Sequence, residues 1–323
     1  MPSDYEFVNF TSAQMPNLAA LFSQVYGNRE LASTYINDRF NTNSFSLSPI
    51  GFLAYPKHGN TIDCKLPSAY YGVLPTVACF RGDKILIAQS GDTMTHPRHR
   101  GKGLFATLGH LTNAVARTAG IEFIFGFPSP LSLPGFKKHL GWQFPFQMLQ
   151  FSRFLVNIPT GLLRKKLGFP STQIPLLAKL YLDRLSLNDC SGKPLLQSCP
   201  SIFNIPRSTE YLNYKKLNSP LKTLLSTNDS TAALKFDGNI NIGEIFQTGN
   251  SVSMIKLISQ IEKIALLSGS IQIRSFFSPE SHLCALLSPF GRISTAMPFG
   301  YLNLNSRLDP SKLDLSLLDF DYF

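Results

Sequence analysis

The stretch Arg98-His99-Arg100-Gly101-Lys102-Gly103 combines residue types that suit the binding of a phosphorylated ligand. The first turn of a helix leaves backbone N–H groups without partners inside the helix, and the helix dipole makes that end positive. Glycines let a loop curl so that several N–H groups converge on an anion, which then approaches closely. Arg98, Arg100 and Lys102 add formal positive charge. We therefore predict a pyrophosphate site over residues 98–103.

The glycine spacing differs from two familiar phosphate motifs, and an exposed basic loop is the simplest alternative to a site. A dinucleotide fingerprint needs GxGxxG, and a Walker loop needs GxxxxGK followed by Ser or Thr, and neither is present. The surroundings favour a site. A strand is expected to end near Thr95, Pro97 interrupts it, and an amphipathic helix begins directly after Gly103.

Hydrophobic spacing predicts the strands and helices that position this loop. Strands are expected at 5–9, 51–55, 71–80, 85–95, 121–127 and 144–157, and helices at 11–25, 30–40, 104–118 and 136–140. The helix after the loop has apolar residues at 104, 105, 108, 111, 115 and 119, which is the spacing of one buried face. The order of strand, loop, helix, strand, helix and strand predicts an α/β fold.

The composition predicts a soluble globular chain of about two domains in a reducing cytoplasm. With 44% hydrophobic and 15% charged residues over 323 positions, no region is biased enough for disorder. No apolar run reaches the roughly 18–20 residues of a spanning helix, and residues 1–10 lack the features of a secretory signal. The five cysteines are widely spaced without a CxxC pair, so neither a disulfide framework nor a zinc knuckle is expected.

The formal charge of +10 calls for an anionic partner or a solvated basic surface. Basic residues outside 98–102 are dispersed and do not alternate with aromatics, which disfavours nucleic acid. A phosphorylated cofactor, a nucleotide-linked substrate and peripheral contact with an anionic membrane stay open. Residues 162–167 and 175–185 are expected to form helices that pack between domains or, less favoured, lie on a membrane. No metal site is expected, because the histidines lack ligand spacing.

The run from Thr93 to Phe105 (TMTHPRHRGKGLF) resembles motif A of the GNAT N-acetyltransferase superfamily. The pattern of that motif is Gln or Arg, two residues of any type, Gly, one residue of any type, and then Gly or Ala. The continuation through 125–128 and 140–142 resembles a subgroup of GNAT proteins often encoded with polysaccharide and amino-sugar genes. The resemblance covers about residues 5–155. It implies a mixed, splayed β-sheet flanked by helices, in which strand 85–95 parts from strand 121–127.

The C-terminal half carries a faint second copy of this pattern. The run 120–130 is matched by 269–279, and Gly91-Asp92 is echoed by Gly243-Glu244. The second copy is a few residues shorter where the glycine loop would lie, so one site per chain is expected. The alternative to a duplicated fold is a chance likeness between two α/β units.

Three parts are therefore predicted along the chain. They are a GNAT domain that binds acyl-coenzyme A at 1–157, a connecting segment at 158–235, and a degenerate GNAT-like half at 236–323.

The resemblance implies that acetyl-coenzyme A, or another acyl-coenzyme A, is the co-substrate of an N-acyltransferase. In the family the pantetheine arm lies between the parted strands, which assigns its partners here to Thr93, Met94 and Thr95. The pyrophosphate then lies on Arg98 to Gly103, with Leu104 and Phe105 beginning the helix behind it. Ser129 is assigned to the cofactor arm, although Ser beside Pro is also common in turns.

Two departures from the family pattern concern catalysis. Ser129 stands where many members have Asn, and residues 135–139 contain no Tyr to act as an acid toward the thiolate. A thiolate leaves readily, so the missing Tyr does not exclude catalysis. Asp92 and His96 are the candidate general bases, since an imidazole can act as a base or proton relay near neutral pH. A strand-end Asp bonded nearby and an exposed His before Pro97 are the alternatives.

Several other side chains have structural and functional interpretations. His99 is expected to bond to phosphate. Tyr70 and Tyr71 either line the acceptor pocket or pack in the core, Trp142 is expected to anchor the core, and His110 is expected on a helix surface.

The subgroup resemblance implies an amino sugar, or its nucleotide-linked form, as acceptor. A small amine, or an amine of a protein N-terminus or lysine, is the first alternative. A non-catalytic module that binds acyl-coenzyme A and regulates a partner is the second, motivated by the missing Tyr and Asn.

Overall fold

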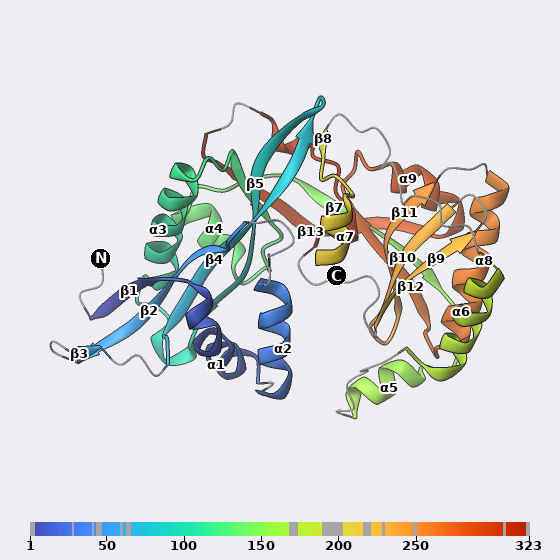
Figure 1. The fold of residues 1–323 in the computed structure, drawn as a ribbon, viewed down its shortest axis with the longest axis horizontal. Helices are drawn as coiled ribbons and strands as arrows, with labels where there is room; N and C mark the ends of the chain where they lie inside the picture. The colour runs from blue at the N-terminus through green and yellow to red at the C-terminus, as the bar shows by residue number, and fades with distance from the viewer. Residues whose placement is uncertain are drawn as a thin grey trace. The chain divides into compact units, whose positions relative to one another are not determined.

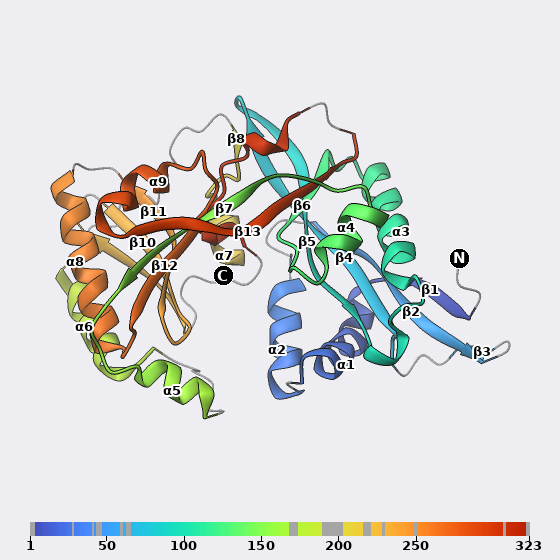
Figure 2. The same cartoon turned by 180° about the vertical axis from the view of Figure 1, so that it is seen from behind.

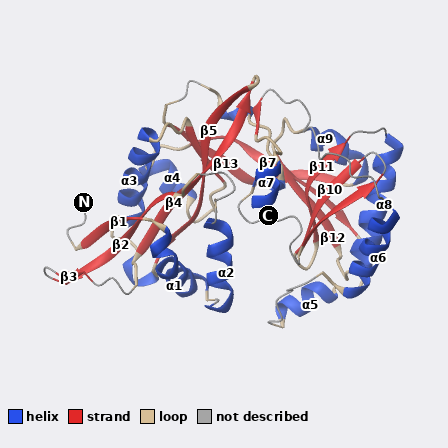
Figure 3. Ribbon diagram, in the orientation of Figure 1, coloured by secondary structure: helices blue, strands red, loops and turns tan. Residues whose placement is uncertain are grey.

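The computed structural model describes residues 4–27, 29–40, 42, 47–58, 61–62, 66–167, 174–188, 203–215, 221–227, 230–247, 251–305 and 308–320. The chain forms two compact units (Figure 1). The first takes in Met1–Phe146 and Met297–Ser311, and the second Gln147–Ala296 and Lys312–Phe323. Strands and helices occur in both units (Figure 3), and the predicted α/β class is confirmed.

The first unit is built on a mixed sheet in the order β1, β2, β4, β5, β6 and the C-terminal part of β13. Its strands are β1 (Tyr5–Asn9), β2 (Ile50–His58), β4 (Ala69–Phe80), β5 (Asp83–Thr95), β6 (Phe123–Gly126) and β13 (Arg292–Asn303), and the short β3 (Thr61–Ile62) pairs with β2. Neighbouring strands are antiparallel, except that β5 and β6 are parallel. The helix between β5 and β6 makes this parallel connection.

Helices cover both faces of this sheet. Successive residues of β4 point to opposite sides, so neighbouring side chains of this strand contact different helices. Tyr70 packs with α1 (Met15–Tyr26) and α2 (Arg29–Phe40) on one face. Tyr71 packs with α3 (Leu104–Thr118) and α4 (Leu133–His139) on the other (Figure 2). Two short 3-10 turns, η1 (Ser12–Gln14) and η3 (Pro97–His99), precede α1 and α3. Both tyrosines are fully buried, so both belong to the core.

The second unit has a sheet in the order β7, β12, β11, β10 and β9. Its strands are β7 (Gln143–Phe154), β8 (Phe203–Asn204), β9 (Lys222–Thr227), β10 (Ser230–Phe236), β11 (Ile240–Gln247) and β12 (Gln272–Phe277). Its helices and 3-10 turns are α5 (Thr160–Lys166), α6 (Leu176–Asn188), α7 (Thr209–Tyr214), α8 (Ser251–Leu267), α9 (His282–Leu287), η4 (Ser288–Phe290), η5 (Pro310–Lys312) and η6 (Leu317–Asp319). None of the helices in these described ranges is long and apolar enough to cross a membrane.

The unit boundaries differ from the three parts expected along the sequence. Elements α6, α7, β9 and β10 lie in the stretch expected to connect two domains, yet they belong to the second unit. Conversely, Gly300–Asn303 of β13 pairs with β6 and completes the sheet of the first unit. In the second unit, β12 pairs with Leu149–Phe154 of β7. Each sheet is therefore finished by a strand from the other end of the sequence.

Gly300 tests the role of β13 in the first unit. A Cβ at this position would collide with the ring of Phe144, so Gly300→Val should destabilise the protein by about 1–3 kcal/mol through overpacking. Asn303→Ala, at an exposed position of the same strand, is the matched control and should change stability little. The measurement is the free energy of unfolding in denaturant. Equal stabilities for both variants would contradict this packing.

Candidate functional site

A gap opens between β5 and β6 of the first unit. The two strands pair only at Ala88–Ile124 and Gln89–Phe125. The carbonyl oxygen of Ser90 still lies 3.1 Å from the position of a Cβ on Gly126. Beyond this point β6 ends at Gly126 while β5 continues to Thr95. The predicted splay of these two strands is therefore present.

A β-bulge in β5 lies at the start of this gap. The pairing of β4 with β5 shifts from Gly72–Gly91 to Tyr70–Met94, so Asp92 and Thr93 both lie opposite Tyr71. Asp92 has a φ of 53°, a left-handed conformation that is uncommon outside glycine. Because a bulge bends its strand and increases the local twist, it redirects the end of β5.

The Asp92 carboxylate is bound by two side chains of α2. Arg39 Nε forms an ion pair with Oδ2, and the Tyr35 hydroxyl donates to Oδ1 at 3.0 Å. The Arg39 and Asp92 side chains are only 4% and 9% exposed. Burial, and then the charge of Asp92, raise the pKa of the nearby Tyr70 hydroxyl. These contacts give Asp92 a role in holding the bulge, and its assignment as a general base stays a prediction.

Several buried polar atoms near the gap have no hydrogen-bond partner within the described part of the chain. They are Ser90 Oγ, Thr93 Oγ1, Tyr71 Oη and Trp142 Nε1. Burial raises the pKa of Tyr71 well above its usual range, and the nearby Ser90 hydroxyl acts in the opposite direction. An unsatisfied buried polar group costs about 1–3 kcal/mol. A polar ligand entering the gap would relieve part of that cost.

The backbone of β5 offers further groups to the gap. His96 N–H donates to the Ser68 carbonyl at 2.8 Å, on the β4 side. The Thr95 carbonyl faces the other way and accepts from Arg100 Nε at 3.4 Å. Since bonding directions alternate along a strand, the peptide groups of Thr95 point away from β4. Thr93 belongs to the bulge, where this alternation is interrupted. Met94, by contrast, buries its side chain on the α1 and α2 face.

The glycine loop joins the end of β5 to the start of α3. His96 caps η3, with Nδ1 accepting from Arg98 N–H at 3.3 Å. Gly101 and Gly103 have left-handed φ values of 76° and 75°, and a Cβ on either would meet nothing within 4 Å. Gly103 is the N-cap of α3, so the free N–H groups of the first helical turn follow it. Open space, glycine conformation and helix start suit an anion.

Three exposed cations and one histidine surround this loop. Arg98, Arg100 and Lys102 are exposed, and Lys102 Nζ lies 5.7 Å from the centre of the Tyr5 ring. The Tyr5 hydroxyl lies 2.7 Å from His99 Nδ1. Partial burial lowers the pKa of His99, and the charges of Lys102, His96 and Arg98 lower it further. The loop therefore gathers three exposed positive charges. None of the described groups that change the pKa of His99 is acidic.

Behind the loop, α3 and α4 are fixed by packing and a turn. Leu104 is buried, and the Phe105 ring lies 5.7 Å from that of Tyr71. The Ser129 carbonyl accepts from the N–H groups of Ser132 and Leu133, and the two serine Oγ atoms are 3.1 Å apart. Ser129 is exposed and shapes the turn into α4, as the turn alternative expected.

The sequence-predicted residues lie on β5, the glycine loop, the start of α3 and the turn after β6, and the structure adds two residues that were missed. Thr93 to Phe105 follow one another along β5, the loop and α3, and Ser129 lies beyond the end of β6. Trp142 packs against Phe136 with ring centres 4.6 Å apart, as expected of a core anchor, and His110 is exposed on α3. Arg39 and Tyr35 were missed, because nothing in a helix sequence reveals a partner more than fifty residues away.

No protein-family model matches this sequence, and no curated protein matches it significantly. Solved structures do match. A GCN5-related N-acetyltransferase from Kribbella flavida is 13% identical, with 94% of this chain and 72% of that chain covered and a TM-score of 0.55. A probable N-acyltransferase of unknown function from Enterococcus faecalis is 12% identical over 93% and 73%, with a TM-score of 0.59.

The N-myristoyltransferase of Saccharomyces cerevisiae, solved with bound myristoyl-CoA, is 9% identical over 99% of this chain and 87% of that chain, with a TM-score of 0.56. At such identities the matches show the fold alone. They extend over both units, so the predicted GNAT-type fold with a second GNAT-like half is confirmed.

The lowered pKa of His99 predicts how an anion would bind to the loop. His99 should be mainly neutral at pH 7 in the free protein, because partial burial and then the neighbouring positive charges disfavour the imidazolium and lower its pKa. A bound pyrophosphate would favour the imidazolium, so the pKa should rise and pyrophosphate affinity should increase as the pH falls. NMR titration of the imidazole, with inorganic pyrophosphate as probe, measures both. His99→Gln should flatten the pH dependence, and an unchanged His99 pKa on saturation would contradict the site.

The Arg39–Asp92 pair predicts a non-additive effect on stability. Arg39→Met takes the cationic partner away from the buried Asp92 carboxylate and should cost about 3–5 kcal/mol. Adding Asp92→Asn removes that charge while keeping a residue that tolerates left-handed φ, so the double variant should regain part of the loss. Denaturant unfolding of both single variants and the double variant measures the coupling. Additive losses would show that the pair is not coupled.

Proposed function

We propose that this protein transfers the acyl group of an acyl-coenzyme A, with acetyl-coenzyme A as the expected donor, to an amine. The glycine loop carries the proposal. It connects the parted strand β5 to α3 and holds two left-handed glycines among three exposed cations. A pyrophosphate in the loop would meet backbone N–H groups of the first turn of α3 and the charges of Arg98, Arg100 and Lys102.

The pantetheine arm is proposed to run from this loop into the gap between β5 and β6. The peptide groups of Thr93 and Thr95 are its proposed partners on β5. Ser129 is its proposed partner beyond β6, and the second copy of the fold supports this. There Ser278 stands at the matching position, its N–H donates to the Leu315 carbonyl at 2.9 Å, and its Oγ accepts from Leu315 N–H at 3.0 Å. A cofactor amide would pair with Ser129 in the same way.

The proposed reaction is direct attack of a neutral amine on the thioester carbonyl. The new C–N bond forms, the C–S bond breaks, and the pantetheine sulfur leaves as a thiolate. The attacking nitrogen loses a proton to a base, and His96 and Asp92 are the candidates. Contacts favour His96, because Arg39 and Tyr35 already occupy the Asp92 carboxylate. His96 Nδ1 accepts from Arg98 N–H at 3.3 Å, so the imidazole has to release this bond before Nδ1 can take up the proton of the amine.

The acceptor is proposed to be an amino sugar or a nucleotide-linked amino sugar, on the resemblance of the sequence to the amino-sugar subgroup. A small amine or a protein amine is the alternative acceptor within the same chemistry. A regulatory module that binds acyl-coenzyme A without turnover is the alternative to an enzyme. The missing Tyr in residues 135–139 motivates that reading.

Replacement of a loop glycine tests the cofactor site. Gly103→Leu places a side chain in the open space over the loop and should weaken acetyl-coenzyme A binding by about 100-fold, since several N–H contacts are lost. Gly82→Leu is the matched control, because Gly82 also has a left-handed φ and open surroundings but lies in the β4–β5 turn. Both variants should lose similar stability, about 1–2 kcal/mol. Equal affinities by calorimetry would contradict the placement.

Release of free thiol from acetyl-coenzyme A separates the enzyme from the regulatory module. We expect release with an amino sugar and a reduction of kcat by about 100-fold or more in His96→Gln, the usual contribution of a general base. Asp92→Asn should mainly lower the stability. Binding of acetyl-coenzyme A without thiol release across amino sugars, small amines and peptides would favour the regulatory module. A large loss of kcat confined to Asp92→Asn would move the base to Asp92.

A further inference from the structure

The second unit repeats the bulged and parted strands of the first. β11 and β12 pair in parallel only at Ile240–Ile273 and Asn241–Arg274. The register of β10 with β11 shifts so that Gly243 becomes the extra residue, one position before Glu244. Ser275 Oγ donates to the Ile242 carbonyl at 2.7 Å, next to this shift. The second pair of strands therefore parts next to a bulge, as β5 and β6 do.

Residues 313–320 of the same chain lie against both parted strands. The Ser278 N–H and Oγ pair with the carbonyl and N–H of Leu315, and Ser316 forms a β-bridge with Phe277. The following turn, η6, contacts both β11 and β12. The apolar side chains of this segment, Leu313, Leu315, Leu317, Leu318 and Phe320, are fully buried. The segment is held as an extended peptide that ends in a tight turn.

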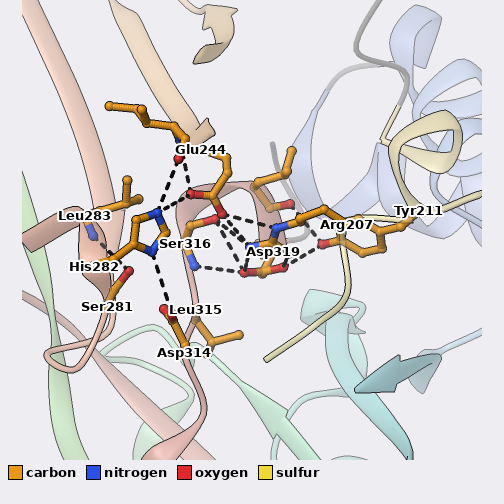
Figure 4. Close-up of polar contacts among 12 residues, drawn as sticks. Arg207, Tyr211, Glu244, Ser281, His282, Leu283, Asp314, Leu315, Ser316 and Asp319 are labelled. Atoms are coloured by element: carbon orange, nitrogen blue, oxygen red, sulfur yellow. Dashed lines mark hydrogen bonds and ion pairs between the residues drawn. The ribbon is translucent and has the colours of Figure 1, made fainter. Parts of the chain in front are cut away.

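A buried arginine joins this segment to the bulged strand (Figure 4). Arg207, whose side chain is 5% exposed, donates to Glu244 Oε2 at 2.7 Å. The same guanidinium donates to Asp319 Oδ2 at 2.8 Å and to Ser316 Oγ at 3.0 Å. The Tyr211 hydroxyl donates to Asp319 Oδ1 at 2.8 Å. The Asp319 carboxylate is therefore bound by the guanidinium of Arg207, and Glu244 of β11 holds the same guanidinium in place.

The other carboxylate oxygen of Glu244 lies near His282, which in turn lies near Asp314. His282 Nε2 lies 3.5 Å from Glu244 Oε1, and His282 Nδ1 lies 3.8 Å from Asp314 Oδ2. Asp314 also donates its N–H to the Phe203 carbonyl at 2.8 Å. The peptide is thus held at its start as well as at its turn.

We infer that the gap of the second unit is a binding site for an extended peptide, and that residues 313–320 are its resident ligand. The recognised pattern is a serine followed three residues later by an aspartate, with buried apolar side chains around them. In the first unit the matching gap is the proposed place of a pantetheine arm. In the second unit this peptide fills it, so a second donor molecule finds no room there. The inference does not depend on transferase activity.

The test uses the full-length chain with a specific protease site inserted after Asn305. After cleavage of the folded protein and removal of unbound peptide, native mass spectrometry should find the C-terminal fragment still attached. A labelled peptide of residues 308–323 should replace the cleaved fragment, up to a stoichiometry of one bound peptide per protein chain. Circular dichroism after fragment release reports whether the rest of the protein stays folded.

Two peptide variants supply the control without altering the protein. The Asp319→Asn peptide should compete at least about tenfold more weakly, because its side chain no longer neutralises Arg207. The Lys312→Ala peptide should compete like the wild type, since Lys312 is exposed and 3.9 Å from an exposed Glu280 carboxylate. Equal competition by the Asp319→Asn peptide would overturn the inference. So would unfolding on fragment release, which would make the segment part of the fold rather than a ligand.

Discussion

The ion pair between Arg39 and Asp92 is the contact on which the candidate site depends. It binds a residue in left-handed conformation at a β-bulge, and the bulge lies where β5 leaves β6. Beyond that departure the Thr95 carbonyl faces away from β4, and the glycine loop begins where β5 ends. A side chain on α2 therefore stabilises the geometry of a site to which it adds no reactive group.

The second unit has the same arrangement of a bulged strand and a buried ion pair, and we propose a different ligand for it. Glu244 beside the β11 bulge is bound by Arg207, as Asp92 is bound by Arg39. The connection after the bulged strand differs, however. Eight residues, 96–103, separate β5 from α3, whereas β11 ends at Gln247 and α8 begins at Ser251. The second unit therefore has no counterpart of the loop proposed to bind an anion, and residues 313–320 of the same chain lie against its parted strands.

Much of the first unit could be predicted from the sequence because its elements are local. Periodicity placed helix 104–118 at its observed bounds and found the strands at 5–9 and 85–95 to within two residues. The shared pattern at 120–130 and 269–279 also predicted a second GNAT-like half. The glycine loop was found because its residue types and spacing lie in one short run. These signals need no knowledge of distant partners.

Long-range pairings could not be predicted in this way. No local pattern shows that Gly300 lies opposite Gly126, that Arg207 binds both Glu244 and Asp319, or that residues 313–320 fill a gap. Helix α6 was assigned to a connecting segment for the same reason, since its partners, β9 and α8, come later in the chain. Burial of a charged pair is a tertiary event, and only the fold reveals it.

The most direct test of the account is the stoichiometry with which acetyl-coenzyme A binds the full-length protein. Isothermal titration should give one molecule per chain, because one gap ends in a glycine loop and the other is filled by residues 313–320. Absence of binding at high micromolar concentration would contradict the acyl-coenzyme A site. Two molecules per chain would contradict the filled second gap.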